Sequence, residues 1–319
     1  MAEKFMVGGQ AVIEGVMMRG PKEIATAVRL PSGKIQVETK LANSFLDRHP
    51  VWKKPLLRGV ITLFESLSLG MKSLSYSARM AGDTEEEELT GRELFLTMAF
   101  AFVMAAVFFL AIPTGAAWIF RHVSENPLFL NLMEGLLRLA IFLAYIWGIG
   151  RTNDIRRVFQ YHGAEHKTIH CYESGLPLTA ENAQKFPRFH PRCGTSFLLL
   201  VMLVSVVIFS FLGWPNLLER ILSRILLLPV VAGISYEAIR LAGRSQNILV
   251  RAFSAPGLWL QRWTTREPDL SMLAVAIEAL KASLPAEAIP KDSANYLQTS
   301  SEILPSLSVE DIRVERRGA

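Results

Sequence analysis

The segment Leu94–Phe120 carries no charged residue, and nearly all of its side chains are apolar. As a helix, its first ~19 residues, which end at Ile112, would extend over about 28 Å at a rise of about 1.5 Å per residue. That length is close to the thickness of the hydrocarbon core of a bilayer. The sequence therefore predicts a membrane-spanning helix, and this prediction constrains the fold class more than any other feature of the chain.

Three further apolar segments have a similar length: Leu128–Ile149, Ser196–Trp214 and Ile221–Leu241. The second of these is uncharged, whereas the other two contain charged side chains. Together with Leu94–Phe120 they predict a mainly α-helical, polytopic membrane protein with about four transmembrane helices. The interrupting charged residues are Glu134, Arg138, Arg224, Glu237 and Arg240.

Lysine and arginine residues are distributed unevenly among the loops. The loop 151–195 contains seven of them, whereas the short loops before the second and fourth apolar segments contain one each. Because basic residues near the ends of spans remain on the cytoplasmic side, both termini and this loop are predicted to be cytoplasmic. Residues 1–30 lack the apolar stretch of a cleaved signal peptide, so we expect a multi-pass protein of the cell membrane.

The net charge of +5 follows from the same bias toward basic loops. No basic stripe with interleaved aromatic residues occurs, so nucleic acid is not an expected partner. The expected partner is the lipid bilayer.

The region 1–92 is predicted to be a small β-containing unit on the cytoplasmic side. Apolar and polar residues alternate in 24–30 and 35–40 on both sides of a Pro-Ser-Gly-Lys turn, which indicates a β-hairpin. Residues 56–80 have apolar side chains at helical spacing, typical of a helix that lies on the membrane or docks against the bundle. The remaining predicted boundaries are a membrane bundle over 93–245, an interfacial and helical segment over 246–285, and a flexible tail over 286–319.

Four of the six histidines and both cysteines lie within a short part of the cytoplasmic loop. Imidazole and thiolate groups are ligands of zinc and related divalent metals. Their clustering between two predicted spans therefore predicts a metal site at the cytoplasmic face of the membrane. The residues are His162, His166, His170, Cys171, His190 and Cys193.

His162, Glu165 and His166 form a His-x-x-Glu-His motif. On a helix the two histidines lie one turn apart on one face, where both imidazoles can bind one ion. In the inverted zincin pattern such a pair holds zinc, and the glutamate activates a water molecule. We therefore expect His162 and His166 as ligands and Glu165 as the catalytic base. Glu237, a carboxylate near the cytoplasmic end of the fourth predicted span, is the candidate third ligand.

Simpler interpretations of these residues remain open. Loop histidines commonly make ordinary hydrogen bonds, and Glu237 can pair with a cation on its own or another helix. A disulfide between Cys171 and Cys193 is not expected in a reducing compartment, where each can remain a free thiol. His170, Cys171, His190 and Cys193 are alternative or supporting ligands, and a site closed by cysteine would be structural rather than catalytic.

Several blocks of sequence resemble one known family. Three of them are long enough to be specific, and two shorter blocks agree with them. The blocks are Gly8–Pro21, Tyr161–Glu173, His190–Phe197, Ile234–Arg240 and Thr264–Asp269. On these residues the chain resembles the YqhQ-like family, bacterial multi-pass membrane proteins that are described as predicted metal-dependent enzymes.

The resemblance implies a location in the bacterial inner membrane and a divalent metal cofactor, for which zinc is the expected ion. It also implies that the glycine-rich N-terminal segment belongs to the functional unit. Glu14 and Arg19 of that segment are therefore further candidate site residues.

Together these features favour a metal-dependent hydrolase that acts on a membrane peptide or a lipid-linked ester, because the site would lie at the bilayer boundary. A non-catalytic membrane assembly or scaffold protein with a structural metal site is the first alternative. The two differ in whether the metal keeps a position open to exchangeable water. A small-solute transporter is the second alternative, with Glu134, Arg138 and Glu237 along its path through the membrane.

Overall fold

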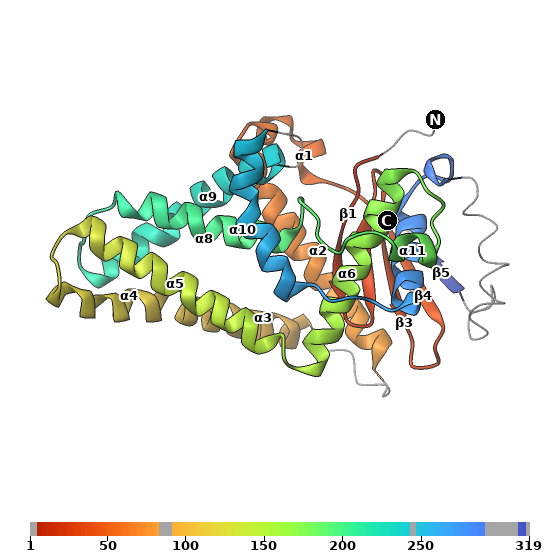
Figure 1. The fold of residues 1–319 in the computed structure, drawn as a ribbon, viewed down its shortest axis with the longest axis horizontal. Coiled ribbons are helices and arrows are strands. Elements are labelled where there is room, and N and C mark those ends of the chain that lie inside the picture. Colours follow the sequence, from red (N-terminus) through yellow and green to blue (C-terminus); the bar gives the residue numbers. More distant parts are fainter. Residues whose placement is uncertain (1–4, 83–90, 243–246, 291–311, 317–319) are drawn as a thin grey trace.

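The computed structural model describes residues 5–82, 91–242, 247–290 and 312–316. Within these ranges the chain forms a β-sheet region, at the right in Figure 1, and a helical bundle that extends away from it. The long helix α2 (Leu57–Ala81) contacts both parts. The predicted mainly α-helical fold with a small N-terminal sheet is confirmed.

Four antiparallel strands form a meander near the N-terminus, and a fifth strand pairs in parallel with the last of them. The strands are β1 (Gly8–Val12), β2 (Gly15–Arg19), β3 (Glu23–Arg29), β4 (Ile35–Leu41) and β5 (Ile312–Arg316). The predicted hairpin is β3–β4, in which Arg29 pairs with Ile35. The glycine-rich segment before it folds as a second hairpin, β1–β2, and leaves β1 at one edge of the sheet.

The segment 286–319, predicted to be a flexible tail, contributes one strand to the sheet. Residues Ile312–Arg316 form β5 along the edge that β4 would otherwise leave free. In the sequence, Ile312 and Val314 alternate with charged residues, which is the pattern of a strand. Because the residues around this short alternation are mostly polar, the segment was not predicted to be a strand.

Helices cover both faces of the sheet. On one face, α6 (Asn153–Ser174) and α11 (Leu270–Ser283) pack on the buried side chains of Val16 and Val37. On the other face, Val28 packs against α2. Because α6 carries the His-x-x-Glu-His motif, this packing holds the motif on a well-buried support.

The bundle consists of an interrupted helix together with α5, α8 and α9, and α10 packs alongside α8 (Figure 1). The interrupted helix consists of α3 (Gly91–Ala106), the π-helical turn η2 (Val107–Ala111), α4 (Ile112–Ala116) and the 3-10 helix η3 (Ala117–His122). The other helices are α5 (Pro127–Ile149), α8 (Gly194–Ser210), α9 (Leu217–Ala242) and α10 (Ile248–Thr264). The short elements elsewhere are α1 (Phe45–Arg48), η1 (Pro50–Lys53), α7 (Ala180–Gln184) and η4 (Ala286–Ala288).

Two helical segments among the described residues are long and apolar enough to cross a membrane: Phe95–His122 and Pro127–Ile149. They correspond to the first two predicted spans. The third predicted span is shorter than expected, because α8 ends at Ser210 before a Gly-Trp-Pro sequence. Helix α9, the fourth, is continuous but contains Pro229 and several charged side chains. The four-span topology therefore stays a prediction.

Candidate metal centre

The His-x-x-Glu-His motif lies on α6, which is helical throughout as the prediction required. The imidazole rings of His162 and His166 lie one turn apart, with their centroids 4.5 Å from each other. Between them, Gly163 faces the loop that follows α10, where an added Cβ would lie 2.1 Å from the carbonyl oxygen of Arg266. Glycine is therefore required for this close approach, although it disfavours the helix by about 1 kcal/mol relative to alanine.

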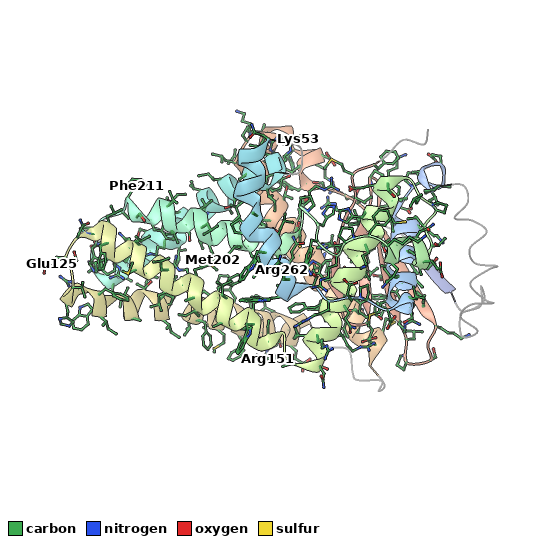
Figure 2. The ribbon with its side chains drawn as sticks, in the orientation of Figure 1. Lys53, Glu125, Arg151, Met202, Phe211 and Arg262 are labelled. Carbon is green, nitrogen blue, oxygen red and sulfur yellow. The ribbon has the colours of Figure 1, made fainter. Side chains whose placement is uncertain are left out.

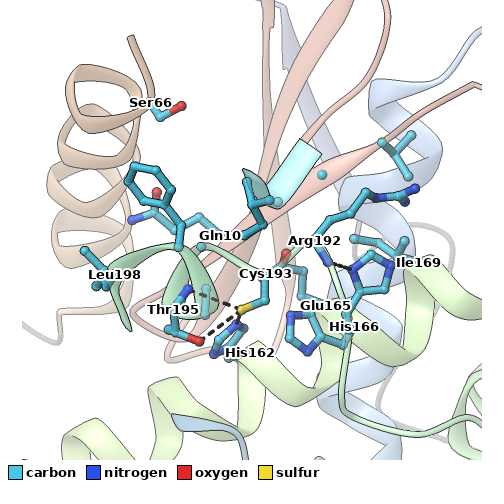
Figure 3. A pocket seen from close by; sticks show the side chains of 18 of the residues that line it. Gln10, Ser66, His162, Glu165, His166, Ile169, Arg192, Cys193, Thr195 and Leu198 are labelled. Atoms are coloured by element: carbon cyan, nitrogen blue, oxygen red, sulfur yellow. Dashed lines mark hydrogen bonds between the residues drawn. The ribbon is translucent and has the colours of Figure 1, made fainter. Parts of the chain in front are cut away.

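Cys193 reaches the two histidines from a distant part of the chain. It is the N-cap residue of α8, and its Sγ lies 3.1 Å from His162 Nε2. The ligand atoms of His162, His166 and Cys193 all lie within 4.8 Å of one another (Figure 3). Thr195 contacts the same sulfur through its hydroxyl group, at 3.1 Å. Two imidazoles and one thiolate are a ligand set that suits zinc.

Backbone carbonyl groups orient both imidazoles. His162 Nδ1 lies 2.8 Å from the carbonyl oxygen of Thr264, and His166 Nδ1 lies 2.6 Å from that of Arg188. When each Nδ1–H donates to its carbonyl, each Nε2 is left with a lone pair for a ligand. Metal-binding histidines almost always donate their second ring N–H in this way. The arrangement therefore fits a metal ion without rotation of either ring.

The cluster favours the ionised form of the cysteine. Burial opposes the charge on Cys193, but the positive charges of His162 and His166 lower the pKa of its thiol well below the ordinary value. Burial also opposes the charge on His162, but the charge and hydrogen bond of Cys193 raise its pKa to about 9. A thiolate is the form that binds a metal or acts as a nucleophile.

Glu165 is buried on α6, the helix of His162 and His166, and lies beside these histidines and Cys193. Burial raises the pKa of its carboxyl group, and the charges of His166 and His162 and a hydrogen bond from the backbone N–H of Gly9 only partly offset this. A Cβ at Gly9 would lie 3.0 Å from Glu165 Cγ. The glycine-rich strand β1 thus packs directly against the predicted base.

A cavity of about 580 Å³ borders the cluster. His162, Glu165 and Cys193 line one side of it, and the backbone of β1 lines another (Figure 3). Helices α2 and α8 line the cavity mainly with the apolar side chains of Leu63, Leu67, Phe197 and Leu198, and α2 adds the hydroxyl groups of Thr62 and Ser66. The space is therefore mainly apolar with a few polar groups, as is typical of a small-molecule or peptide site.

A second group, His170, Glu173 and His190, also brings its ligand atoms within 4.8 Å of one another. Here Arg192 binds the carboxylate of Glu173, and His190 Nε2 lies 3.7 Å from the same group. His170 Nε2 lies 2.9 Å from the carbonyl oxygen of Phe189, and His190 Nδ1 accepts the N–H of Arg192 at 3.3 Å. This group is therefore better suited to support the site than to hold a second ion.

Ionisation in the second group agrees with that role. Burial, which outweighs the neighbouring Glu173, lowers the pKa of His190, so its imidazole is neutral near pH 7. Burial alone would raise the pKa of Glu173, but hydrogen bonds from His190 and Arg192 outweigh burial and lower this pKa to about 2. Ring contacts connect the two groups, with the centroids of His166 and His190 5.6 Å apart.

Glu237 and Cys171 lie outside both groups among the described residues. The Glu237 carboxylate binds the guanidinium of Arg58 on α2, with Nε 2.6 Å from Oε1. A salt bridge to another helix was the simpler interpretation of Glu237. The structure agrees with that interpretation, because the carboxylate pairs with α2 and does not lie beside His162. Cys171 lies in the core between the sheet and α6, where burial raises the pKa of its thiol to about 11.

Glu14 and Arg19 lie on the β1–β2 hairpin but do not line the cavity. Glu14 has a positive φ of 50° in the turn, and its carboxylate binds Arg157 on α6. Arg19 lies 3.8 Å from Glu65 on α2. Both residues therefore attach the hairpin to neighbouring helices.

Several residues that hold the site carried no signal in the sequence. Thr264 and Arg188 act through backbone carbonyls, which any side chain would supply. Gln261 exchanges two hydrogen bonds with the backbone of His190, each 2.8 Å long. A glutamine within an apolar, Trp-rich helix is a weak hint that its amide has a buried partner.

The fold and the cluster define a mainly α-helical protein with two helices long enough to span a membrane and with His, Cys and Glu groups that could hold a metal ion. The model of the family described as "Protein of unknown function (DUF1385)" matches residues 54–286, and the chain belongs to this family. It is also 36% identical over 301 residues to "Uncharacterized protein YqhQ" of Bacillus subtilis (strain 168), covering 90% of this chain and 94% of that protein. The YqhQ-like resemblance is thereby confirmed. No solved structure matches the chain.

Proposed function

We propose that this chain is a membrane-associated, zinc-dependent hydrolase in which His162, His166 and Cys193 hold the ion and Glu165 is the catalytic base. The observation that carries this proposal is the convergence of two Nε2 atoms and one Sγ beside a buried carboxyl group, at the wall of a cavity. When bound, zinc supplies Lewis acidity and lowers the pKa of water to about 7.

Glu165 has the properties that a base needs at this position. Burial raises the pKa of its carboxyl group, as is common for carboxyl groups that act as general bases. The N–H of Gly9 holds the carboxyl group in place. Glu165 would accept a proton from water as the water attacks the substrate and pass it on to the leaving group.

The number of donors favours catalysis over a structural site. The first group contains three ligand side chains within the described part of the chain, whereas structural zinc sites have four. The cavity supplies room for water and substrate at the remaining position. Because most of its exposed lining is apolar, with polar groups near the His/Cys cluster and the hydroxyl groups of Thr62 and Ser66 on α2, the substrate class that fits best is an apolar membrane peptide or a lipid-linked ester.

One contact favours a second candidate function, a thiol hydrolase. The Cys193 Sγ and His162 Nε2 atoms, 3.1 Å apart with Thr264 orienting the imidazole, also form the pair that a cysteine nucleophile requires. The same Nε2 atom cannot bind a metal ion and accept the thiol proton. The two functions therefore exclude each other and can be separated by experiment.

Hydrolysis of p-nitrophenyl acetate by the purified full chain separates them. Because the proposed reaction needs the ion, dipicolinate should abolish hydrolysis and stoichiometric zinc should restore it. Cys171→Ala is the matched control and should behave like the wild type, because that thiol lies in the core. Activity that survives chelation but is lost with iodoacetamide would instead support the thiol hydrolase.

We further propose that all four apolar helices cross the membrane and that both termini and the loop 151–195 are cytoplasmic, since basic residues are concentrated in that loop. Alkaline phosphatase fused after Ser124 should then be active, and a fusion after Lys185 should be inactive. The reverse pattern of activity would contradict this orientation.

A further inference from the structure

A buried cluster of four charged side chains lies in the bundle, on helices other than those that carry the His/Cys groups. Glu134 and Arg138 belong to α5, and Arg220 and Arg224 belong to α9. Their exposed fractions are only 1%, 5%, 5% and 2% in that order. Glu134 and Arg138 are spaced as an i, i+4 ion pair, but α9 adds two further arginines to the same carboxylate.

One carboxylate therefore faces three guanidinium groups. Arg138 Nη2 lies 2.7 Å from one oxygen of Glu134, and Arg220 and Arg224 Nη2 atoms lie 3.1 and 2.6 Å from the other. Thr114 also donates its hydroxyl to Glu134 at 2.9 Å. Among the described residues, Glu134 is the acidic side chain that pairs with these arginines, so two positive charges in the cluster lack a counter-charge.

The arginines also retain unused donors. Within the described ranges, Arg224 has no hydrogen-bond acceptor for Nε or Nη1, and the Nε atoms of Arg138 and Arg220 have none either. Burial of an unpaired charge costs several kcal/mol on the usual scale, so such groups normally bind a counter-ion. The arrangement thus points to an anion as the missing partner.

A cavity of about 420 Å³ borders the cluster at Arg220. Arg220 lies at its wall, with its guanidinium 3.5 Å from the ring centroid of Trp214. Arg121 and Trp118 complete the basic and aromatic lining. The cavity lies next to the loops at the end of the bundle farthest from the sheet, marked by Glu125 and Phe211 in Figure 2.

We propose that this basic pocket, which Arg121 and Arg220 line, binds a phosphate-type oxyanion, supplied by the phosphodiester group of an anionic lipid, and that the buried charges of Arg138 and Arg224 around Glu134 add to its positive potential. Guanidinium groups match phosphate geometry through paired N–H donors. Trp118 and Trp214 are of the residue type enriched where a bilayer meets water, and they border the same pocket. The proposal is independent of the hydrolase function, because no His/Cys group contributes to it.

The test measures the midpoint of thermal unfolding, Tm, of the full chain in nanodiscs of phosphatidylcholine with and without phosphatidylglycerol. A ligand that binds the folded state and not the unfolded state raises Tm. A parallel arm in detergent compares inorganic phosphate with chloride at equal ionic strength. A rise with phosphatidylglycerol alone supports a lipid, and a rise with phosphate supports an oxyanion from solution.

Variants connect the rise to the pocket. Arg121→Gln at the rim and Arg220→Gln at the wall should each reduce the Tm rise by half or more. If Arg220→Gln fails to fold, the rim variant carries the test. Arg151→Gln is the matched control, because Arg151 also lies against a tryptophan, 3.3 Å from the ring of Trp147, but at the other end of α5. No Tm rise in either arm, or an equal rise in Arg121→Gln and wild type, would overturn the proposal.

Discussion

Replacing Glu165 with glutamine should lower kcat for p-nitrophenyl acetate by roughly 10²–10⁴-fold, the usual contribution of a general base. The substitution keeps the size of the side chain and an oxygen for the N–H of Gly9, so the fold and the three ligand side chains should be unaffected. The variant should bind as much zinc as the wild type. Loss of activity with metal retained is the result that separates a catalytic site from a structural one.

Glu237→Gln is the control for this substitution. Because Glu237 binds Arg58 on α2, the variant should keep both its zinc and its activity. If Glu237→Gln lost its zinc, Glu237 would be a metal ligand after all, and its pairing with Arg58 in this structure would be contradicted. Unchanged activity in Glu165→Gln would remove the proposed base and favour a membrane scaffold with a structural ion.

Gly163→Ala should destabilise the protein, even though alanine favours a helix more than glycine does. The new Cβ would lie 2.1 Å from the carbonyl oxygen of Arg266, and neither backbone can rotate away as a side chain could. We expect a loss of about 1–3 kcal/mol in the free energy of unfolding, as is typical of overpacking. The displaced loop would also move Thr264 from His162, and loss of such a supporting contact lowers metal affinity by about 10–100-fold.

Gly148→Ala provides the matched comparison, because Gly148 is also helical but, beyond its own helical backbone, no atom of the described residues lies within 4 Å of its added Cβ. There the helix preference should prevail, with a gain of up to about 1 kcal/mol. Thermal unfolding and zinc titration of both variants check the pair of expectations. Equal stability of Gly163→Ala and wild type would show that α6 does not approach the loop after α10.

Local patterns in the sequence were sufficient to predict some elements of this fold. The β3–β4 hairpin and the helix that carries His162 and His166 follow from alternation and spacing over a few residues. The two longest apolar segments likewise form helices of membrane-spanning length. In each case, neighbours in the sequence are also neighbours in space.

Contacts between distant segments could not be predicted in the same way. Cys171 and Cys193 looked equivalent as ligands, but the packing of α6 turns one into the core, and the start of α8 brings the other to His162. Glu237 binds an arginine 179 positions earlier in the chain, which no local pattern indicates. Strand β5 depends on an edge that β4 forms at the opposite end of the sequence.

The measurement that tests the proposed metal centre most directly is the metal content of the purified full chain, wild type beside His162→Ala/His166→Ala. Because these residues supply two of the three proposed ligands, we expect about one zinc per chain in the wild type and none in the double variant. Cys171→Ala should keep its zinc, because that thiol lies away from the site. Wild-type protein without zinc after reconstitution, or a double variant that retains it, would contradict the proposed centre.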